Sequence, residues 1–194
     1  MNRNLDKAVQ VIKKGGIIIF PTDTAFGIGC KIDSPASIER LFKIRNRSSQ
    51  KAVPVLASSI KMVEEYALQI DPATRRLMKK YWPGGVTIIL KCKKEKIPLL
   101  ARGGGDTIGI RIPGNRTALL LIRKVGVPIL APSANFSGGK TPFRASDINI
   151  KLARLVDFFL AGRCKMKEAS TVIDVTKKPW KVLRQGAVRL GNSD

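Results

Sequence analysis

The segment PTDT, residues 21–24, places hydroxyl and carboxylate side chains directly after the apolar run 17–20. In open α/β sheets, ligands bind where buried strands end, so these side chains are candidate ligand contacts. The glycines that follow, Gly27 and Gly29, fit places where the backbone passes close to a ligand or takes a positive φ. The alternative is a tight turn in which the Thr and Asp side chains hydrogen-bond to their own backbone.

A basic cluster, RNRSSQK at residues 45–51, carries side chains that suit phosphate. The guanidinium group of Arg45 or Arg47 can donate two parallel hydrogen bonds to two oxygens of a phosphate, and Lys51 can act as a point charge. The alternative is a solvated helix end in a basic protein.

Two further segments combine strand patterns with polar side chains. In TIGIR the two-residue period of a strand puts Thr107, Gly109 and Arg111 on one face. An inward arginine needs an anionic partner, which is either a ligand carboxylate or an acid of the chain. Ser133 and Asn135 follow the apolar run VPILA and suit phosphate oxygens or the Mg²⁺ shell, or else an Asx or Ser turn.

Composition excludes several classes of enzyme. The 194 residues include no histidine, which rules out Ser-His-Asp hydrolases, histidine-ligated zinc sites and histidine general bases. Three cysteines, far apart and without a CxxC pair, favour a reducing compartment and no structural metal. Lys and Arg number 36 against 14 Asp and Glu, a net charge of +22. This balance favours polyanionic partners such as nucleotides or RNA, although a generally basic proteome would give the same number.

Periodicity predicts helices that alternate with strands, without repeats or linkers, in a single domain spanning 1–194. The expected helices lie at 5–14, 34–45, from 59, 71–81 and 116–126, and the expected strands at 17–20, 53–56, 86–91, 107–113, 127–131, 156–162, 170–175 and 180–184. This alternation indicates an α/β or α+β domain with a sheet of mixed strand direction. No apolar stretch suits a membrane span or a signal peptide, so we expect a cytoplasmic location and no membrane partner.

The order and spacing of these clusters resemble the YrdC/TsaC family of L-threonylcarbamoyladenylate synthases, in the short single-domain form. PTDTAFGIG is similar to the family's PTDTVYGLG, the basic cluster to its KxRPxxK and Ser133-x-Asn135 to its SxN. The resemblance extends from about residue 15 to 187. It implies a twisted, open mixed sheet, flanked by helices around a large concave basic cavity.

The resemblance also implies a reaction. L-threonine, bicarbonate or CO2, and ATP would give threonylcarbamoyl-AMP and pyrophosphate, with Mg²⁺ carried by ATP and no metal ligated directly by the protein. The product would serve threonylcarbamoyl modification of the adenosine beside the anticodon in tRNAs that read codons beginning with A. Implied partners are a downstream transferase complex of the TsaD, TsaB and TsaE type and tRNA itself on the basic surface.

Site residues are carried over by motif position. The implied threonine contacts are Thr22, Arg111 and Ser170. The implied catalytic residues are Arg45, Arg47 and Lys51, and these also bind ATP together with Thr107, Ser133, Asn135, Thr141 and Arg184. Asp23 is left open between a contact to the substrate amine and a turn.

The sequence departs from the family pattern at four positions. Arg45 stands where the family usually has Lys, Phe26 where it has Tyr, Ser48 where it has Pro, and Phe143 where a small hydroxyl residue is common. Arginine keeps the positive charge but changes the geometry of phosphate binding.

Three alternatives to the synthase remain. One is a non-catalytic RNA-binding protein of the same fold, against which stand the few aromatics (6%) and their position mostly in apolar runs. Another is a carbamoyl-transfer domain of the hydrogenase-maturation type, whose zinc-finger and acylphosphatase segments have no counterpart here. The third is a nucleotide-binding scaffold protein without dependence on threonine.

Overall fold

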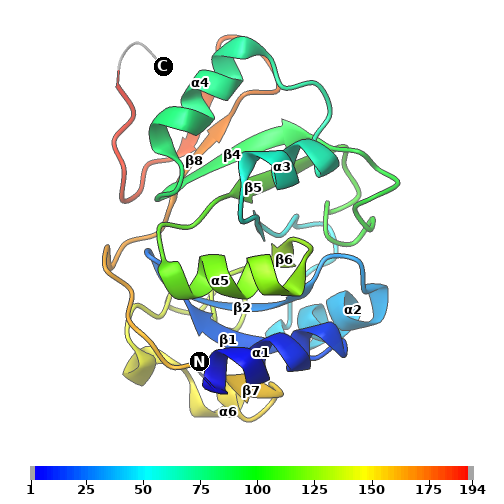
Figure 1. The fold of residues 1–194 in the computed structure, drawn as a ribbon, viewed down its shortest axis with the longest axis vertical. Helices are drawn as coiled ribbons and strands as arrows, with labels where there is room; N and C mark the ends of the chain where they lie inside the picture. The colour runs from blue at the N-terminus through cyan, green and yellow to red at the C-terminus, as the bar shows by residue number, and fades with distance from the viewer. Residues whose placement is uncertain (1–2, 192–194) are drawn as a thin grey trace.

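The computed structural model describes residues 3–191, and these form one twisted, nine-stranded sheet with helices around it (Figure 1). The strand order is β7-β1-β2-β6-β3-β5-β4-β8-β9. The pairs β1·β7, β3·β5 and β4·β8 are parallel and the others antiparallel, which confirms the predicted mixed sheet. The strands are β1 (Ile18–Pro21), β2 (Phe26–Lys31), β3 (Val55–Leu56), β4 (Val86–Lys91), β5 (Thr107–Arg111), β6 (Ile129–Leu130), β7 (Phe158–Phe159), β8 (Thr171–Asp174) and β9 (Lys181–Arg184).

The helices begin where polar side chains can cap them. Ser59, Asp71 and Asn115 each accept a hydrogen bond from the backbone N–H three residues later, at 3.1, 2.6 and 3.1 Å. Ser34, where the second helix was expected to begin, makes no such bond and shares a hydrogen bond with Ser37 instead. The helices are α1 (Arg3–Lys13), α2 (Pro35–Arg45), α3 (Ile60–Tyr66), α4 (Pro72–Tyr81), α5 (Arg116–Val125) and α6 (Ile150–Ala153), with a 3₁₀ turn at Ala145–Asp147.

Side chains on both faces of the sheet are buried. In and beside β1, Ile17 and Ile19 belong to one apolar cluster while Ile18 and Phe20 belong to another, which contains the apolar faces of α1 and α5. Successive strand residues point to opposite faces, so a strand covered on both sides must be apolar throughout. No helix within residues 3–191 is long and apolar enough to cross a membrane.

The glycines after PTDT lie in a strand that the sequence did not predict. Gly27 and Gly29 belong to β2, and neither takes a positive φ. A Cβ at Gly29 would lie 2.1 Å from the carbonyl oxygen of Leu130, so this glycine is needed by the neighbouring strand β6 and not by a ligand. Gly27 does border a pocket. The prediction of a ligand approach was therefore wrong for Gly29.

Other differences concern short elements. The strands expected at 53–56, 127–131 and 156–162 pair over two residues each, as β3, β6 and β7, and α6 was not predicted at all. Segments this short are defined by the neighbours they pair with, so local periodicity does not show their limits.

Candidate active site

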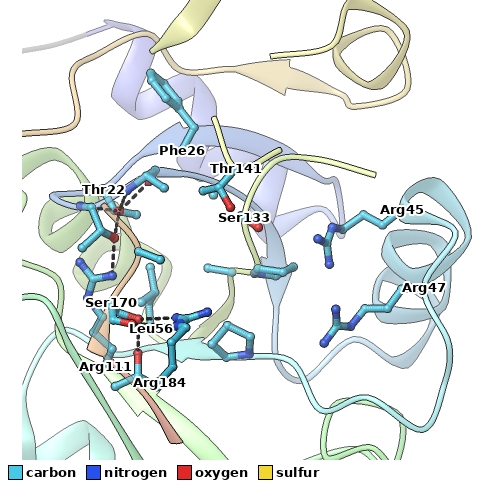
Figure 2. Close-up of a pocket in the computed structure, with 18 residues that line it drawn as sticks. Thr22, Phe26, Arg45, Arg47, Leu56, Arg111, Ser133, Thr141, Ser170 and Arg184 are labelled. Carbon is cyan, nitrogen blue, oxygen red and sulfur yellow. Dashed lines mark hydrogen bonds between the residues drawn. The ribbon is translucent and has the colours of Figure 1, made fainter. Parts of the chain in front are cut away.

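A pocket of about 210 Å³ opens where β1 turns into β2, beside the end of α2 and the ends of β5 and β9 (Figure 2). Four arginines line it, Arg45, Arg47, Arg111 and Arg184, and no Asp or Glu does. The described residues that line the cavity therefore give it a positive charge. Its enclosed volume is below the roughly 300–1,000 Å³ typical of small-molecule sites, so a nucleotide would extend beyond it.

Thr22 closes the turn between β1 and β2. Its hydroxyl donates to the carbonyl oxygen of Ala25 at 2.6 Å and accepts from the backbone N–H groups of Thr24 and Ala25, both at 3.2 Å. The turn interpretation is thus confirmed for PTDT. The same residue also lines the pocket, so its role in the turn does not remove it from the site.

Arg111 finds its anionic partner within the chain. Its guanidinium donates to Asp23 Oδ1, to Thr24 Oγ1 at 2.6 Å and to the Gly84 carbonyl at 2.8 Å. Both members of the ion pair are buried, at 5% and 3% exposure. Burial lowers the pKa of Arg111, while the Asp23 carboxylate acts in the opposite direction.

Asp23 lies behind Arg111 and outside the pocket wall. Its second oxygen, Oδ2, is buried without a hydrogen-bond partner. The geometry therefore favours a counter-ion for Arg111 over a contact to a substrate amine, the choice that the sequence left open.

Ser170 belongs to a hydroxyl pair that the sequence analysis missed. Its Oγ shares a hydrogen bond of 2.8 Å with Thr87 Oγ1, and Arg184 donates to both the hydroxyl and the carbonyl of Ser170, at 3.2 and 3.0 Å. Thr87 is 4% exposed and lines the pocket. The signal was a single hydroxyl within the apolar strand VTIILK. We call this group, Thr22, Thr24, Thr87, Arg111, Ser170 and Arg184, the hydroxyl end.

Arg45 and Arg47 form the opposite side of the pocket, which we call the arginine end (Figure 2). Arg45 is the last residue of α2, which ends because Asn46 takes a left-handed conformation with φ of 51°. Arg45 is 3% exposed and donates from Nε to the Asn135 carbonyl at 2.9 Å, but its Nη1 has no partner.

The positive charges of the arginine end are electrostatically unfavourable when no anion is bound. Burial and the nearby charge of Arg47 lower the pKa of Arg45 to about 10, and burial lowers that of Arg47. Arg47 donates to backbone carbonyls of Lys51 and Ala52 at 3.3 and 2.7 Å. Neither arginine pairs with an acid among residues 3–191. The arrangement suits a polyanion such as a phosphate chain.

Ser133 and Thr141 line the pocket between the two ends (Figure 2). Asn135 lies next to the wall, where its side chain accepts from Ser133 Oγ at 2.5 Å and donates to the carbonyls of Phe136 and Gly139. These are the local bonds expected of the turn alternative.

Lys51 and Thr107 are not brought to the pocket. Lys51 is exposed beyond Arg47. Thr107 begins β5 while Arg111 ends it, and a strand rises about 3.3 Å per residue, so the two residues are about 13 Å apart. Sharing one strand face with Arg111 therefore does not bring Thr107 to the pocket, and its contact to ATP stays a prediction.

Metal and thiol chemistry have little support in this part of the chain. Within residues 3–191 no group of three or more His, Cys, Asp or Glu is placed to hold a metal. The cysteines are free and buried, and burial raises the pKa of Cys30 to about 12 and that of Cys164 to about 11.

Comparisons with known proteins agree with the motifs. A family model for Sua5, YciO and YrdC proteins, described as telomere recombination, matches residues 10–186. The threonylcarbamoyl-AMP synthase of Pyrococcus abyssi is 33% identical over 187 residues, which cover 94% of this chain and 54% of that protein. The structure of P. abyssi Sua5 complexed with L-threonine superposes with a TM-score of 0.87 at 30% identity, over 94% of this chain and 54% of that one.

A relative of similar length has no described function. The uncharacterized protein YciO of Escherichia coli is 32% identical over 185 residues, 95% of this chain and 89% of that protein, and its crystal structure gives a TM-score of 0.86. The chain spans about half the length of the synthase but most of YciO. With a family model that matches nearly its whole length, the chain belongs to the Sua5/YciO/YrdC family.

Proposed function

We propose that this protein is a threonylcarbamoyl-AMP synthase, which makes threonylcarbamoyl-AMP and pyrophosphate from L-threonine, bicarbonate or CO2, and ATP. The observation that carries the proposal is the division of one pocket into two chemically different ends. The hydroxyl end offers Arg111 and Arg184, both hydrogen-bonded within the protein, among hydroxyl side chains. The arginine end offers Arg45 and Arg47, which have no acidic partner among residues 3–191.

The hydroxyl end would receive L-threonine. Arg111 uses three of its five N–H groups within the protein, so two remain for a carboxylate. Ser170 and Thr22 supply hydroxyls at the same end. The complex of P. abyssi Sua5 with L-threonine, at 30% identity, supports L-threonine as a ligand of this protein.

The arginine end would receive the phosphates of ATP, with Ser133 and Thr141, which lie between the two ends, as further contacts and with Arg184 as a nucleotide contact from the hydroxyl end. Mg²⁺ would enter on the phosphates, because the pocket wall has hydroxyls but no carboxylate to hold a metal. Asn135 would act by holding Ser133 and Arg45 in place, through the bonds described above.

The proposed chemistry needs no histidine. The neutral threonine amine adds to CO2 and loses a proton to solvent, which gives a carbamate. A carbamate oxygen then attacks the α-phosphorus of ATP, and the bond between this phosphorus and the oxygen bridging to the β-phosphate breaks. Pyrophosphate leaves with the electron pair of that bond. Catalysis then consists of aligning the two substrates and stabilising negative charge on the phosphates, the tasks for which Arg45 and Arg47 are suited.

The product would be consumed by a threonylcarbamoyl transfer to tRNA, in the modification of the adenosine beside the anticodon. A mixed anhydride of this kind is an activated acyl donor, so a separate transferase complex must accept it. These partners are part of the proposal.

Pyrophosphate release from ATP, measured with and without L-threonine and with and without bicarbonate, tests the proposal. We expect release only when both are present, together with an AMP adduct whose mass equals that of threonylcarbamoyl-AMP. Pyrophosphate release that does not depend on L-threonine would support a different nucleotide-dependent activity. ATP binding without any pyrophosphate release would support a scaffold protein.

A further inference from the structure

A second basic cavity lies away from the active-site pocket, between α4 and the β8–β9 hairpin. It has a volume of about 450 Å³ and shares no lining residue with the pocket. Its wall is formed by Arg76, Lys80, Lys178 and Trp180, with apolar α4 side chains and Pro179 between them. We call it the α4–hairpin groove. In Figure 1, α4 lies at one end of the long axis of the molecule and α6 at the other.

The groove is positive, and none of the described residues in its wall is an acid. Neither Arg76 nor Lys178 forms an ion pair within the described residues 3–191, and both are exposed. The carboxylate of Asp71 caps α4, and its pKa is lowered mainly by the hydrogen bond from the Thr74 backbone and only to a lesser degree by the charge of Lys178. Three further exposed lysines flank the lining residues in the sequence: Lys79, Lys177 and Lys181.

Trp180 adds an aromatic surface to the positively charged wall of the α4–hairpin groove. It lies in the segment KKPWK and is half-buried, so part of its ring lines the groove. The two tryptophans of the chain differ in their polar contacts. Trp82 donates its indole N–H to the Val86 carbonyl at 2.7 Å, whereas the buried indole N–H of Trp180 has no acceptor among residues 3–191. A buried indole N–H usually finds a partner, so Trp180 carries an unmet hydrogen-bonding group.

Cations beside an aromatic ring match one class of ligand well. Single-stranded nucleic acids bind by phosphate contacts to Lys and Arg and by stacking of bases on aromatic side chains. A double helix has its base faces already stacked, so it offers phosphates but nothing for the tryptophan. An acidic peptide would also use the cations but would gain nothing specific from the ring.

We propose that the α4–hairpin groove binds single-stranded RNA, with a base on Trp180 and phosphates on Arg76 and Lys178. The flanking lysines extend the track for neighbouring phosphates. This site goes beyond the proposed synthase reaction and does not depend on it.

The charge contribution is tested by fluorescence anisotropy with a labelled single-stranded oligouridine of about 12 nucleotides, within the usual footprint of such sites. The assay contains neither ATP nor threonine. We expect Arg76→Ala with Lys178→Ala to weaken binding about tenfold or more and to reduce the slope of log K against log salt by about 1.4, since two phosphate contacts are lost. The matched control is Lys151→Ala with Arg154→Ala, which removes the same charge from exposed residues at and beside α6.

The aromatic contribution is tested by two substitutions at one position. Trp180→Phe keeps a ring that can stack, while Trp180→Leu fills space without stacking. We expect binding to fall about fivefold or more in the Leu variant and to stay within about threefold in the Phe variant, because one base–aromatic stack is lost only in the former. Melting temperatures of both variants separate this effect from a loss of folding.

Several results would overturn the proposal. An equal loss in the α6 control would show binding by net charge alone. Displacement of the RNA by ATP or pyrophosphate would place it in the active-site pocket, and displacement by polyglutamate at equal charge would show a general anion site. Equal binding in the Phe and Leu variants would exclude stacking. Each of these outcomes leaves threonine-dependent pyrophosphate release unaffected, so the two proposals fail separately.

Discussion

The two ends of the active-site pocket differ in how far their polar side chains are paired within the protein. At the hydroxyl end Thr22, Thr87, Arg111 and Ser170 bind one another or the backbone, and a buried acid balances the arginine. At the arginine end Arg45 keeps an unpaired Nη1, and its pKa is lowered by burial and by Arg47. At the hydroxyl end the charge of Arg111 is therefore balanced within the protein, whereas the buried Arg45 at the arginine end has no acidic partner among residues 3–191.

This difference separates what stabilises the fold from what serves the ligand. Removing one partner of a buried, hydrogen-bonded ion pair lowers the stability of the protein strongly, because the remaining charge is left uncompensated. A buried guanidinium without an anion costs free energy in the folded state. We therefore expect substitutions at the hydroxyl end to lower stability and substitutions at the arginine end to lower anion affinity.

The largest expected effect is at the buried ion pair. Asp23→Asn keeps the shape of the side chain but leaves Arg111 without its counter-ion, so we expect a loss of about 3–5 kcal/mol in the free energy of unfolding. The matched variant is Arg45→Met, which removes a buried charge without an acidic partner. We expect it to change stability by less than about 1 kcal/mol or to increase it. Urea denaturation measures both, and equal losses would contradict the comparison.

Arg47→Ala tests the arginine end through binding. Loss of one charge-assisted phosphate contact should weaken ATP binding by about 1.5–3 kcal/mol, roughly tenfold to a hundredfold. The melting temperature should stay the same, because Arg47 lies outside the helix and bonds only to nearby backbone. Calorimetry gives the affinity, with Lys43→Ala on the exposed side of α2 as the control for net charge. Unchanged ATP affinity and turnover would reject the assignment.

Thr22→Ala tests a residue that belongs to both the turn and the pocket. Removing the hydroxyl leaves two buried N–H groups without their acceptor, which should cost about 1–3 kcal/mol of stability. If Thr22 also contacts threonine, the apparent threonine KM rises while that for ATP is almost unchanged. Thr22→Ser, which keeps the hydroxyl, should restore both properties. A stability loss with no threonine-specific defect would leave Thr22 a turn residue only.

The smallest effect is expected for Thr87→Val, which has nearly the same shape but cannot bond to Ser170. We expect about 0.5–1.5 kcal/mol in threonine binding and little change in ATP binding, because the Ser170 hydroxyl loses the partner that orients it. Steady-state kinetics with each substrate varied in turn shows the effect. A larger defect with ATP would place Ser170 on the nucleotide side.

The fold was predictable where local patterns are strong. Short stretches of neighbouring residues determine several features: the apolar run at β1, the caps at Ser59 and Asp71, and the left-handed end of α5 at Gly126. The strand β2 was missed because its glycines are unusual in strands, and Gly29 is required there only by the close approach of Leu130.

The site was predictable as a set of motifs but not as a set of contacts. The sequence placed Arg111 inward and required an anion, yet its partner Asp23 lies 88 residues away, and no local pattern selects it among the acids. The only sequence signal for Thr87 was one hydroxyl side chain within an apolar strand. Thr107 shares a strand face with Arg111, but the two residues lie at opposite ends of β5. Tertiary pairing decides such contacts, and periodicity does not contain it.

The most direct test of the two-ended pocket is a crossed binding measurement. Dissociation constants for L-threonine and for pyrophosphate are determined by calorimetry in Ser170→Ala and in Arg47→Ala, with melting temperatures to confirm folding. The account predicts that Ser170→Ala weakens threonine binding about tenfold and leaves pyrophosphate within about twofold, and that Arg47→Ala does the reverse. If either substitution weakened both ligands by the same factor, the pocket would not be divided as described and the assignment of its ends to two substrates would be contradicted.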